Sequence, residues 1–109
     1  MALAYAYMWE FHVKRQSRAE FERVYGPDGE WVALFKDSKG YLGTQLHHDI
    51  NKSERYFTVD LWESKDEYDA FQREHAHEFD LLDKKCNSLT DEEALIGEFH
   101  CWQSFTRSR

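Results

Sequence analysis

Residues 55–67 constrain the fold more than any other part of this chain, because they read as a strand that runs almost directly into a helix. The run Arg55–Trp62 is rich in the aromatic and β-branched residues that favour strands. Ser64 followed three residues later by Glu67 is a capping box, and this pattern predicts a helix start at Lys65. A strand followed at once by a helix therefore occupies the middle of the chain.

One acidic residue, Asp60, interrupts this otherwise apolar strand. Because side chains alternate between the two faces of a strand, Asp60 shares a face with Tyr56, Thr58 and Trp62. Burying an unpaired carboxylate is costly, so Asp60 is expected to be exposed, paired or used for function. This makes Asp60 the first candidate functional residue.

Patterns on either side predict the remaining elements, since period-two alternation indicates a strand and apolar residues three or four apart indicate a helix. They predict strands over Ala4–Val13, Tyr41–Ile50, Arg55–Trp62 and Leu95–Phe105. They predict a helix from Ser17, a short helix over Trp31–Phe35 and a long helix over Lys65–Lys84. A short turn capped at Thr90–Glu93 is predicted before the last strand. The apolar stripe of the long helix holds Tyr68, Phe71, His75, Phe79 and Leu82. Gly43 inside the second strand indicates a bulge.

The order strand, helix, strand, strand, helix, strand predicts one α+β domain over residues 1–109. Two βαβ-like halves with right-handed crossovers give a ferredoxin-like βαββαβ sandwich, in which a four-stranded antiparallel sheet carries its helices on one face. The length of 109 residues suits a single hydrophobic core.

The other face of this sheet is expected to need a cover. The third strand alternates Phe57, Val59 and Leu61 with its other residues, so neither of its faces has a water-facing character. Aromatic residues make up 17% of the chain, more than one helix–sheet interface buries comfortably. We therefore expect a two-fold homodimer that forms through the sheet face, a ligand pocket, or both.

The net charge and the cysteines indicate which binding partners and which cellular compartment are expected. A net charge of −7 and a pI near 5.3 repel nucleic acid and anionic membranes, so neither is expected as a partner. Cys86 and Cys101 form no Cys-x-x-Cys pair, and no secretory segment precedes the fold, which favours a reduced, cytoplasmic setting. His47 and His48 are adjacent on a strand and point to opposite faces, so no metal site is predicted.

The strand end Asp60–Ser64 (Asp-Leu-Trp-Glu-Ser), followed on the next helix by Tyr68–Phe71 (Tyr-Asp-Ala-Phe), resembles the antibiotic biosynthesis monooxygenase-like family. The resemblance extends from about Tyr7 to Trp102. It implies a dimeric α+β barrel with a pocket between the sheet and the helices, toward which the Tyr7 side of the first strand points. It also implies activities that range from oxygen insertion into quinol-like aromatics without metal or flavin, through quinol oxidation, to heme degradation.

The heme-degrading branch of this family carries an Asn on its first strand and a Trp and a His on its second helix. With the strand-ending Trp62 aligned, these positions fall on Trp9, Phe71 and Leu81. None of the three residues matches. The resemblance therefore disfavours heme degradation, and heme binding ranks last among the expected functions.

His75 is the candidate catalytic base, because an imidazole in a pocket can accept a proton near neutral pH. Asp60 would orient His75 or bind a substrate hydroxyl, and burial would raise the pKa of its carboxyl toward a useful range. Two plainer interpretations stay open. His75 would be a core residue with one satisfied hydrogen bond, and Asp60 would form a salt bridge across the sheet or the dimer interface.

Five aromatic side chains could form a slot for a flat ligand, since aromatic walls stack on rings and exclude water. They are Tyr7, Trp9, Tyr56, Trp62 and Phe71. Simple core packing is the alternative role for these residues.

The favoured function is a cofactor-independent monooxygenase that acts on a small aromatic or quinol-like substrate. Loss of a proton to His75 would make an electron-rich anion that can pass an electron to oxygen, so the chemistry requires no cofactor. The alternative is a dimeric protein that binds a small hydrophobic molecule, or serves as a scaffold, without catalysis.

Overall fold

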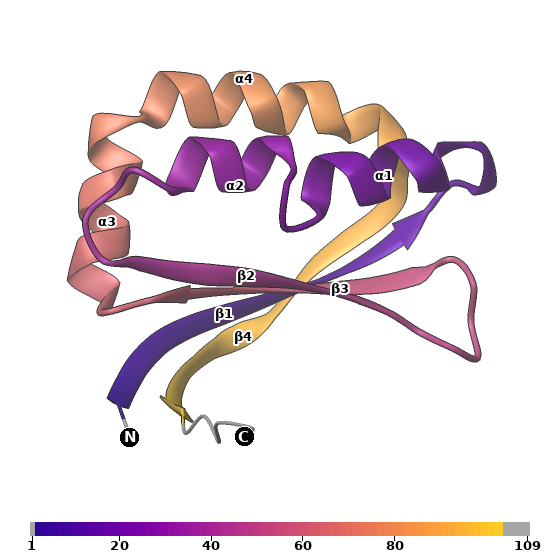
Figure 1. Cartoon of the computed structure of the whole chain (residues 1–109). Helices are drawn as coiled ribbons and strands as arrows, with labels where there is room; N and C mark the ends of the chain where they lie inside the picture. Colours follow the sequence, from indigo (N-terminus) through magenta and orange to yellow (C-terminus); the bar gives the residue numbers. More distant parts are fainter. Residues whose placement is uncertain (1, 104–109) are drawn as a thin grey trace.

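The structure is a computed structural model that describes residues 2–103, and it has two layers, a sheet and a set of helices (Figure 1). The antiparallel strands are β1 (Ala2–Val13), β2 (Tyr41–His48), β3 (Arg55–Trp62) and β4 (Thr90–Gln103), in the order β2-β3-β1-β4. The helices are α1 (Arg18–Tyr25), α2 (Glu30–Phe35), α3 (Lys65–Glu74) and α4 (Ala76–Cys86), with short 3-10 turns over Arg15–Ser17 and Asn87–Leu89. The ferredoxin-like α+β fold predicted from the sequence is confirmed.

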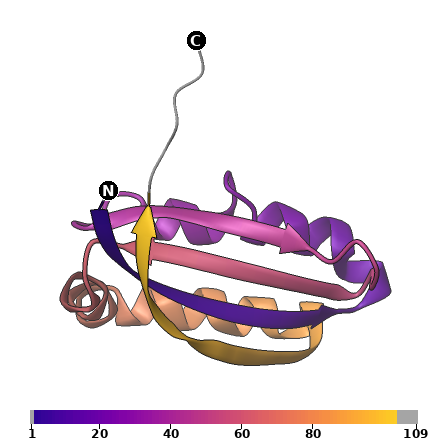
Figure 2. The same ribbon diagram turned by 90° about the horizontal axis from the view of Figure 1, so that it is seen from below.

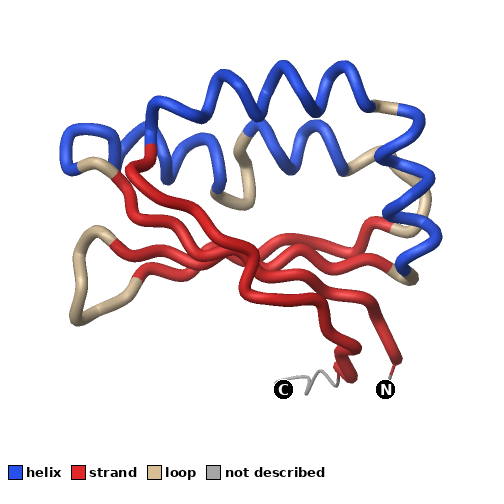
Figure 3. The backbone as a smooth tube through the Cα atoms, turned by 180° about the vertical axis from the view of Figure 1, so that it is seen from behind, coloured by secondary structure: helices blue, strands red, loops and turns tan. Residues whose placement is uncertain are grey.

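The helices gather on one side of the sheet, as the view from behind also shows (Figure 3). The helix start that the sequence marks most clearly forms as predicted: the Oγ of Ser64 accepts a hydrogen bond from the backbone N–H of Glu67 at 3.2 Å. Ser17 occupies the corresponding position before α1, but its side chain makes no capping hydrogen bond, because a 3-10 turn already leads into this helix. Of these two predicted helix starts, only the one at Ser64 has a side-chain cap.

The single helix predicted over Lys65–Lys84 is wrong, because the chain bends at His75 and α3 and α4 are separate (Figure 1). His75 has φ −123° and ψ 27°, outside the helical range. The bend lets Phe71 pack on Trp62 of β3, with ring centroids 5.4 Å apart. Beyond the bend, Phe79 packs on Trp31 of α2 at 5.0 Å. Contacts in two directions therefore override a continuous helical pattern.

The last strand, β4, begins at Thr90 rather than at the predicted Leu95. The predicted turn at Thr90–Glu93 is wrong, because these residues pair with the end of β1 and the turn lies before them. Phe105, the predicted end of the strand, lies outside the described residues. The earlier start matters because it places Glu93 opposite Phe11 on β1.

The core lies between the sheet and the helices and is mostly aromatic. Its most deeply buried large side chains are Trp62, Tyr56, Phe21 and Phe71. Tyr5, Tyr7 and Phe11 of β1 are buried on the same side, as the family resemblance implies.

No described helix covers the opposite face of the sheet (Figure 2). Ala6, Val59 and Leu61 form an apolar cluster there, with Met8 packed against it. Phe99 of β4 lies opposite Ala6 and is 41% exposed. These five residues are called the open-face patch below.

Two further findings concern the setting of the protein. Cys86 and Cys101 are both free thiols. Within residues 2–103, every helix falls short of the length and apolar character that a membrane span requires.

Candidate functional site

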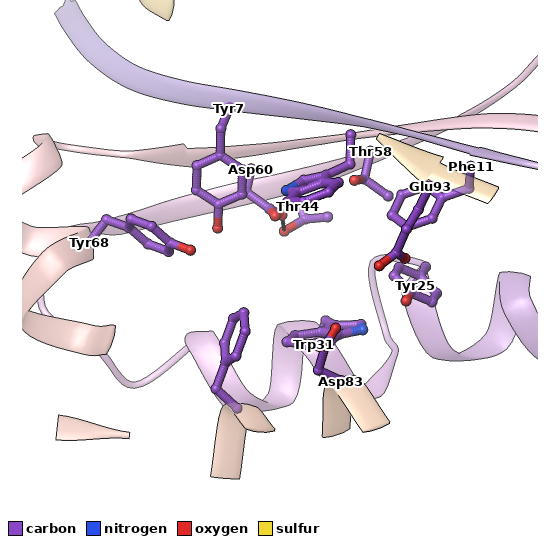
Figure 4. A pocket seen from close by; sticks show the side chains of 12 residues that line it. Tyr7, Phe11, Tyr25, Trp31, Thr44, Thr58, Asp60, Tyr68, Asp83 and Glu93 are labelled. Carbon is purple, nitrogen blue, oxygen red and sulfur yellow. Dashed lines mark hydrogen bonds between the residues drawn. The ribbon is translucent and has the colours of Figure 1, made fainter. Parts of the chain in front are cut away.

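A cavity of about 220 Å³ lies between the sheet and the helices (Figure 4). All four strands and all four helices of the described chain contribute side chains to it. The lining residues are Tyr7, Trp9, Phe11, Tyr25, Trp31, Thr44, Thr58, Asp60, Tyr68, Phe79, Asp83 and Glu93. Seven of these are aromatic, so the cavity suits a flat ring that stacks on its walls.

Asp60 lies on the floor of this cavity, on β3, between Tyr7 of β1 and Thr44 of β2. Only 8% of Asp60 is exposed. The Oγ1 of Thr44 donates a hydrogen bond to Oδ1 of Asp60 at 2.6 Å. No described basic side chain forms an ion pair with Asp60, so the salt bridge considered for it from the sequence is absent from residues 2–103.

The hydrogen bond to Asp60 extends outward through a second hydroxyl. The Tyr41 oxygen lies 2.6 Å from Oγ1 of Thr44. Because Thr44 has one hydroxyl hydrogen and directs it to Asp60, Tyr41 donates and Thr44 accepts in this pair. A chain of two hydrogen bonds, from Tyr41 through Thr44, thus fixes one oxygen of the Asp60 carboxyl.

Burial shifts the acid–base properties of this part of the cavity. Loss of solvent raises the pKa of Asp60 from 3.8 to about 6, although hydrogen bonds from Thr44 and Tyr7 oppose the change. Burial also raises the pKa of the Tyr7 hydroxyl well above its usual value, and the negative charge of Asp60 raises it further. At neutral pH the pair is therefore a carboxylate beside a protonated phenol.

Tyr68 of α3 completes this end of the cavity. Its ring lies 4.7 Å from that of Tyr7, and its hydroxyl accepts a hydrogen bond from Nε2 of Gln72 at 2.5 Å. Burial raises the pKa of Tyr68, so it too stays protonated near neutral pH. Two phenol groups and one carboxylate thus face the same space (Figure 4).

The other end of the cavity holds Glu93 of β4 and Asp83 of α4 (Figure 4). Glu93 lies at the exposed edge. Partial loss of solvent around its carboxyl raises the pKa of Glu93, and the negative charge of Asp83 adds to this effect. The cavity therefore has carboxyl groups at both ends and aromatic walls between them.

The structure brings only some of the residues predicted from the sequence to the cavity. Tyr7, Trp9 and Asp60 line it. Tyr56, Trp62 and Phe71 do not, and the core-packing alternative describes their positions. Trp62 is fully buried against Phe35 and Phe71, and the Tyr56 hydroxyl donates to Glu22 at 2.5 Å while its ring stacks on His48.

His75, the predicted base, lies outside the cavity lining. It occupies the N-cap position of α4 at the bend without a side-chain capping hydrogen bond, its Nδ1 is 3.0 Å from Oε2 of Glu78, and its ring stacks on Phe71. The bend removes His75 from the face that a straight helix would have given it. The structure thus does not bring His75 to Asp60.

For several lining residues the sequence predicts the helix or strand on which they lie but not their place in the cavity. Tyr68 and Phe79 belong to the predicted helix stripe, and the structure shows that this stripe reaches the cavity. Thr44 depends on the strand register after Gly43, which the sequence does not specify. Glu93 was assigned to a turn, so its place on β4 was missed.

The arrangement of the possible metal-binding side chains in residues 2–103 is the next feature of the site. Among residues 2–103, no group of three or more His, Cys, Asp or Glu side chains is arranged to hold a metal ion. The carboxyl groups of the cavity are separated between its two ends rather than clustered (Figure 4).

The fold and the cavity define a small ferredoxin-like domain with a partly open aromatic site between sheet and helices. The family described as antibiotic biosynthesis monooxygenase matches residues 4–79, well over half of the chain. The chain therefore belongs to the antibiotic biosynthesis monooxygenase family. No curated protein matches the chain at a significant level.

Solved structures show the same fold. SnoaB, a cofactor-independent oxygenase from Streptomyces nogalater, is similar with a TM-score of 0.76 and 19% identity, over 95% of this chain and 98% of that one. A heme-degrading protein from Mycobacterium tuberculosis has a TM-score of 0.66 and 20% identity, over 98% and 100% of the two chains. A Bordetella bronchiseptica protein, provisionally assigned as an antibiotic biosynthesis monooxygenase, has a TM-score of 0.70 and 22% identity, over 96% and 100%. At these identities the likeness establishes the fold.

Proposed function

We propose that this protein is a cofactor-independent oxygenase of a small aromatic or quinol-like substrate, with Asp60 as the base. The observation that carries the proposal is a buried carboxylate on the floor of an aromatic cavity, which forms an ion pair with no described basic side chain and has a pKa of about 6. The likeness to SnoaB, which is a cofactor-independent oxygenase, supports the same reaction class.

The raised pKa of Asp60 makes proton transfer easier. A phenol-like hydroxyl has a pKa of about 10, and each pKa unit corresponds to about 1.36 kcal/mol. Transfer to a carboxylate with a pKa of 3.8 would cost about 8 kcal/mol, whereas transfer to Asp60 at about 6 costs about 5 kcal/mol.

The later steps need oxygen and no other oxidant. The substrate anion passes one electron to O₂, which gives a substrate radical and superoxide, and these combine to form a carbon–oxygen bond. The resulting hydroperoxide loses water and leaves a carbonyl. In balance, a phenol loses its O–H hydrogen and one ring C–H hydrogen, and with O₂ it gives a quinone and H₂O, so one oxygen atom is retained and the other leaves as water.

The hydrogen-bonded chain from Tyr41 positions the base. It holds Oδ1 of Asp60 and so fixes the orientation of the carboxyl that accepts the substrate proton. Thr44 and Tyr41 act through Asp60 and are therefore positioning residues.

Oxygen uptake with hydroquinone and naphthohydroquinone as probes tests the assignment, after subtraction of the rate without protein. Asp60→Asn should lower kcat by about a hundredfold to ten-thousandfold, because it removes the proton acceptor. Asp66→Asn, an exposed acidic residue on α3, is the matched control and should retain the wild-type rate.

A variant at His75 decides between the two bases. If Asp60→Asn retains wild-type turnover while His75→Ala abolishes it, the base is His75 and the present assignment is wrong. If wild-type protein binds the probes and returns them unchanged, the non-catalytic binding function replaces the oxygenase.

We also propose a homodimer through the open-face patch, as the family resemblance implies. The patch is apolar, it has no helix cover in the described chain, and it includes a partly exposed Phe99. Sedimentation velocity should give the mass of a dimer, and a monomer at micromolar concentration would contradict the interface. A cytoplasmic location is likewise proposed, supported by the two free thiols.

A further inference from the structure

We infer that the cavity selects aromatic amines over aromatic carboxylates, with the ammonium group of the ligand at the Glu93 end. This inference rests on the proposed function, because it assigns a substrate class to the same cavity. It goes further because it predicts the charge of the ligand and names Glu93 as the residue that recognises this charge.

The lining of the cavity is negative. It contains Asp60, Asp83 and Glu93, and none of the described lining residues is Lys, Arg or His. The two lysines next to Asp83 in sequence are engaged elsewhere. Lys84 pairs with Asp80 at 3.0 Å and Lys85 with Glu30 at 2.9 Å. The potential inside the cavity is therefore negative, which attracts a cation and repels an anion.

The two ends of the cavity offer different chemistry. At one end Asp60 is held by Thr44 beside Tyr7, which suits a hydroxyl (Figure 4). At the other end, Glu93 lies near Tyr25, and Asp83 approaches from α4 (Figure 4). The negative charge of Asp83 repels that of Glu93 and disfavours the ionised form of Glu93. A bound ammonium group would relieve that repulsion.

Aromatic faces surround the same end, which is an observation independent of the two acids. The rings of Phe11 and Tyr25 have centroids 5.0 Å apart, and those of Tyr25 and Trp31 are 6.1 Å apart. All three residues line the cavity. Aromatic faces next to carboxylates form the usual environment for an alkylammonium ion, since the ring quadrupole and the anion both attract it.

The ligand class follows from the two ends together. A hydroxyl at Asp60, a ring between the aromatic walls and an amine at Glu93 describe a hydroxyaryl amine. A ligand with a carboxylate in place of the amine would meet Glu93 and Asp83 directly and would be repelled.

Three probes with one ring and different charge test this inference by isothermal titration calorimetry. They are tyramine, which is a cation, tyrosol, which is neutral, and para-hydroxyphenylacetate, which is an anion. Tyramine should bind at least about tenfold more tightly than tyrosol, because a charge-assisted hydrogen bond exceeds a neutral one by about 1.4 kcal/mol. The anion should bind most weakly.

Two neighbouring variants locate the effect. Glu93→Gln should reduce the preference for tyramine over tyrosol toward one. Glu92→Gln is the matched control, because Glu92 pairs with His12 on the opposite face of the strands and does not line the cavity. It should leave all three affinities unchanged. Unfolding curves of both variants check that each one folds.

The outcomes separate this inference from the proposed function. If tyrosol or the anion binds as tightly as tyramine, the charge preference is wrong while the aromatic site stands. If the preference survives Glu93→Gln, the residue assignment is wrong. If none of the probes binds, the ligand site itself is overturned, and both proposals fall with it.

Discussion

The two faces of β3 show how one strand serves two purposes. Toward the helices it presents Asp60 and Trp62, which are 8% and 0% exposed, together with other buried residues. Toward the opposite side it presents Val59 and Leu61, which are apolar and are covered by none of the helices in residues 2–103. The first face gains its burial from the chain's own helices and the second only from neighbouring strands. The consecutive residues Asp60 and Leu61 are therefore under different constraints.

The largest expected difference between these faces concerns core stability. Trp62→Ala should lower the free energy of unfolding by about 3–5 kcal/mol, because it empties a fully enclosed site against Phe35 and Phe71. Leu61→Ala should cost about 2 kcal/mol or less in the monomer, since one side of Leu61 lacks a helix. Urea unfolding followed by circular dichroism measures both values.

Protein concentration sharpens this comparison. The loss caused by Leu61→Ala should grow as concentration rises, if the open-face patch forms the dimer, whereas the loss caused by Trp62→Ala should not change. Equal and concentration-independent losses would show that the two faces do not differ in this way.

A smaller effect of opposite sign is expected at Asp60. Its folded-state pKa is raised from 3.8 to about 6, so the folded protein binds this proton more tightly than the unfolded chain does. The contribution of Asp60 to the free energy of unfolding is fully present below about pH 4, where the carboxyl is protonated, and it is lost as pH rises through about 6. The loss approaches about 3 kcal/mol at neutral pH.

Asp60→Asn should therefore make the protein more stable at pH 7, by up to about 3 kcal/mol, while it removes turnover. The difference in unfolding free energy between variant and wild type should shrink as pH falls to 4. Taking this difference cancels the opposite trend from Glu10 and Asp49, whose pKa values are lowered by Arg55 or by nearby amides. A variant that is less stable than wild type at every pH would contradict the destabilisation ascribed to the buried Asp60 carboxylate.

The sequence was sufficient for the fold because local signals agreed with one another. The capping box at Ser64 and the strand Arg55–Trp62 both appear where they were predicted. It was also sufficient to single out Asp60, because a carboxyl in phase with buried aromatics is conspicuous on one strand. These features depend on residues that are close in sequence.

The remainder of the site depends on contacts that sequence patterns do not contain. His75 fits the helix stripe, but the bend that moves it arises from packing of Phe71 and Phe79 on different elements. Glu93 reaches the cavity only because β4 pairs with the end of β1. Both outcomes are set by tertiary pairing, which outweighs local propensity.

The irregularity in β2 has a consequence for how such a site can change over time. The register shifts between Tyr41 and Gly43, where Gly43 adopts φ +153°, so Leu42 is an extra residue. In a regular strand, residues three apart point to opposite faces, yet here Tyr41 and Thr44 meet on one face. Without the bulge, and with Tyr41 still opposite Trp62, Leu42 would pair with Leu61 and Gly43 with Asp60, so Thr44 would point to the other face of the sheet, away from Asp60. A lineage could thus acquire or lose the hydrogen bond from Thr44 to Asp60 through the backbone at Leu42 and Gly43 alone, and comparison of lining residues would not detect it.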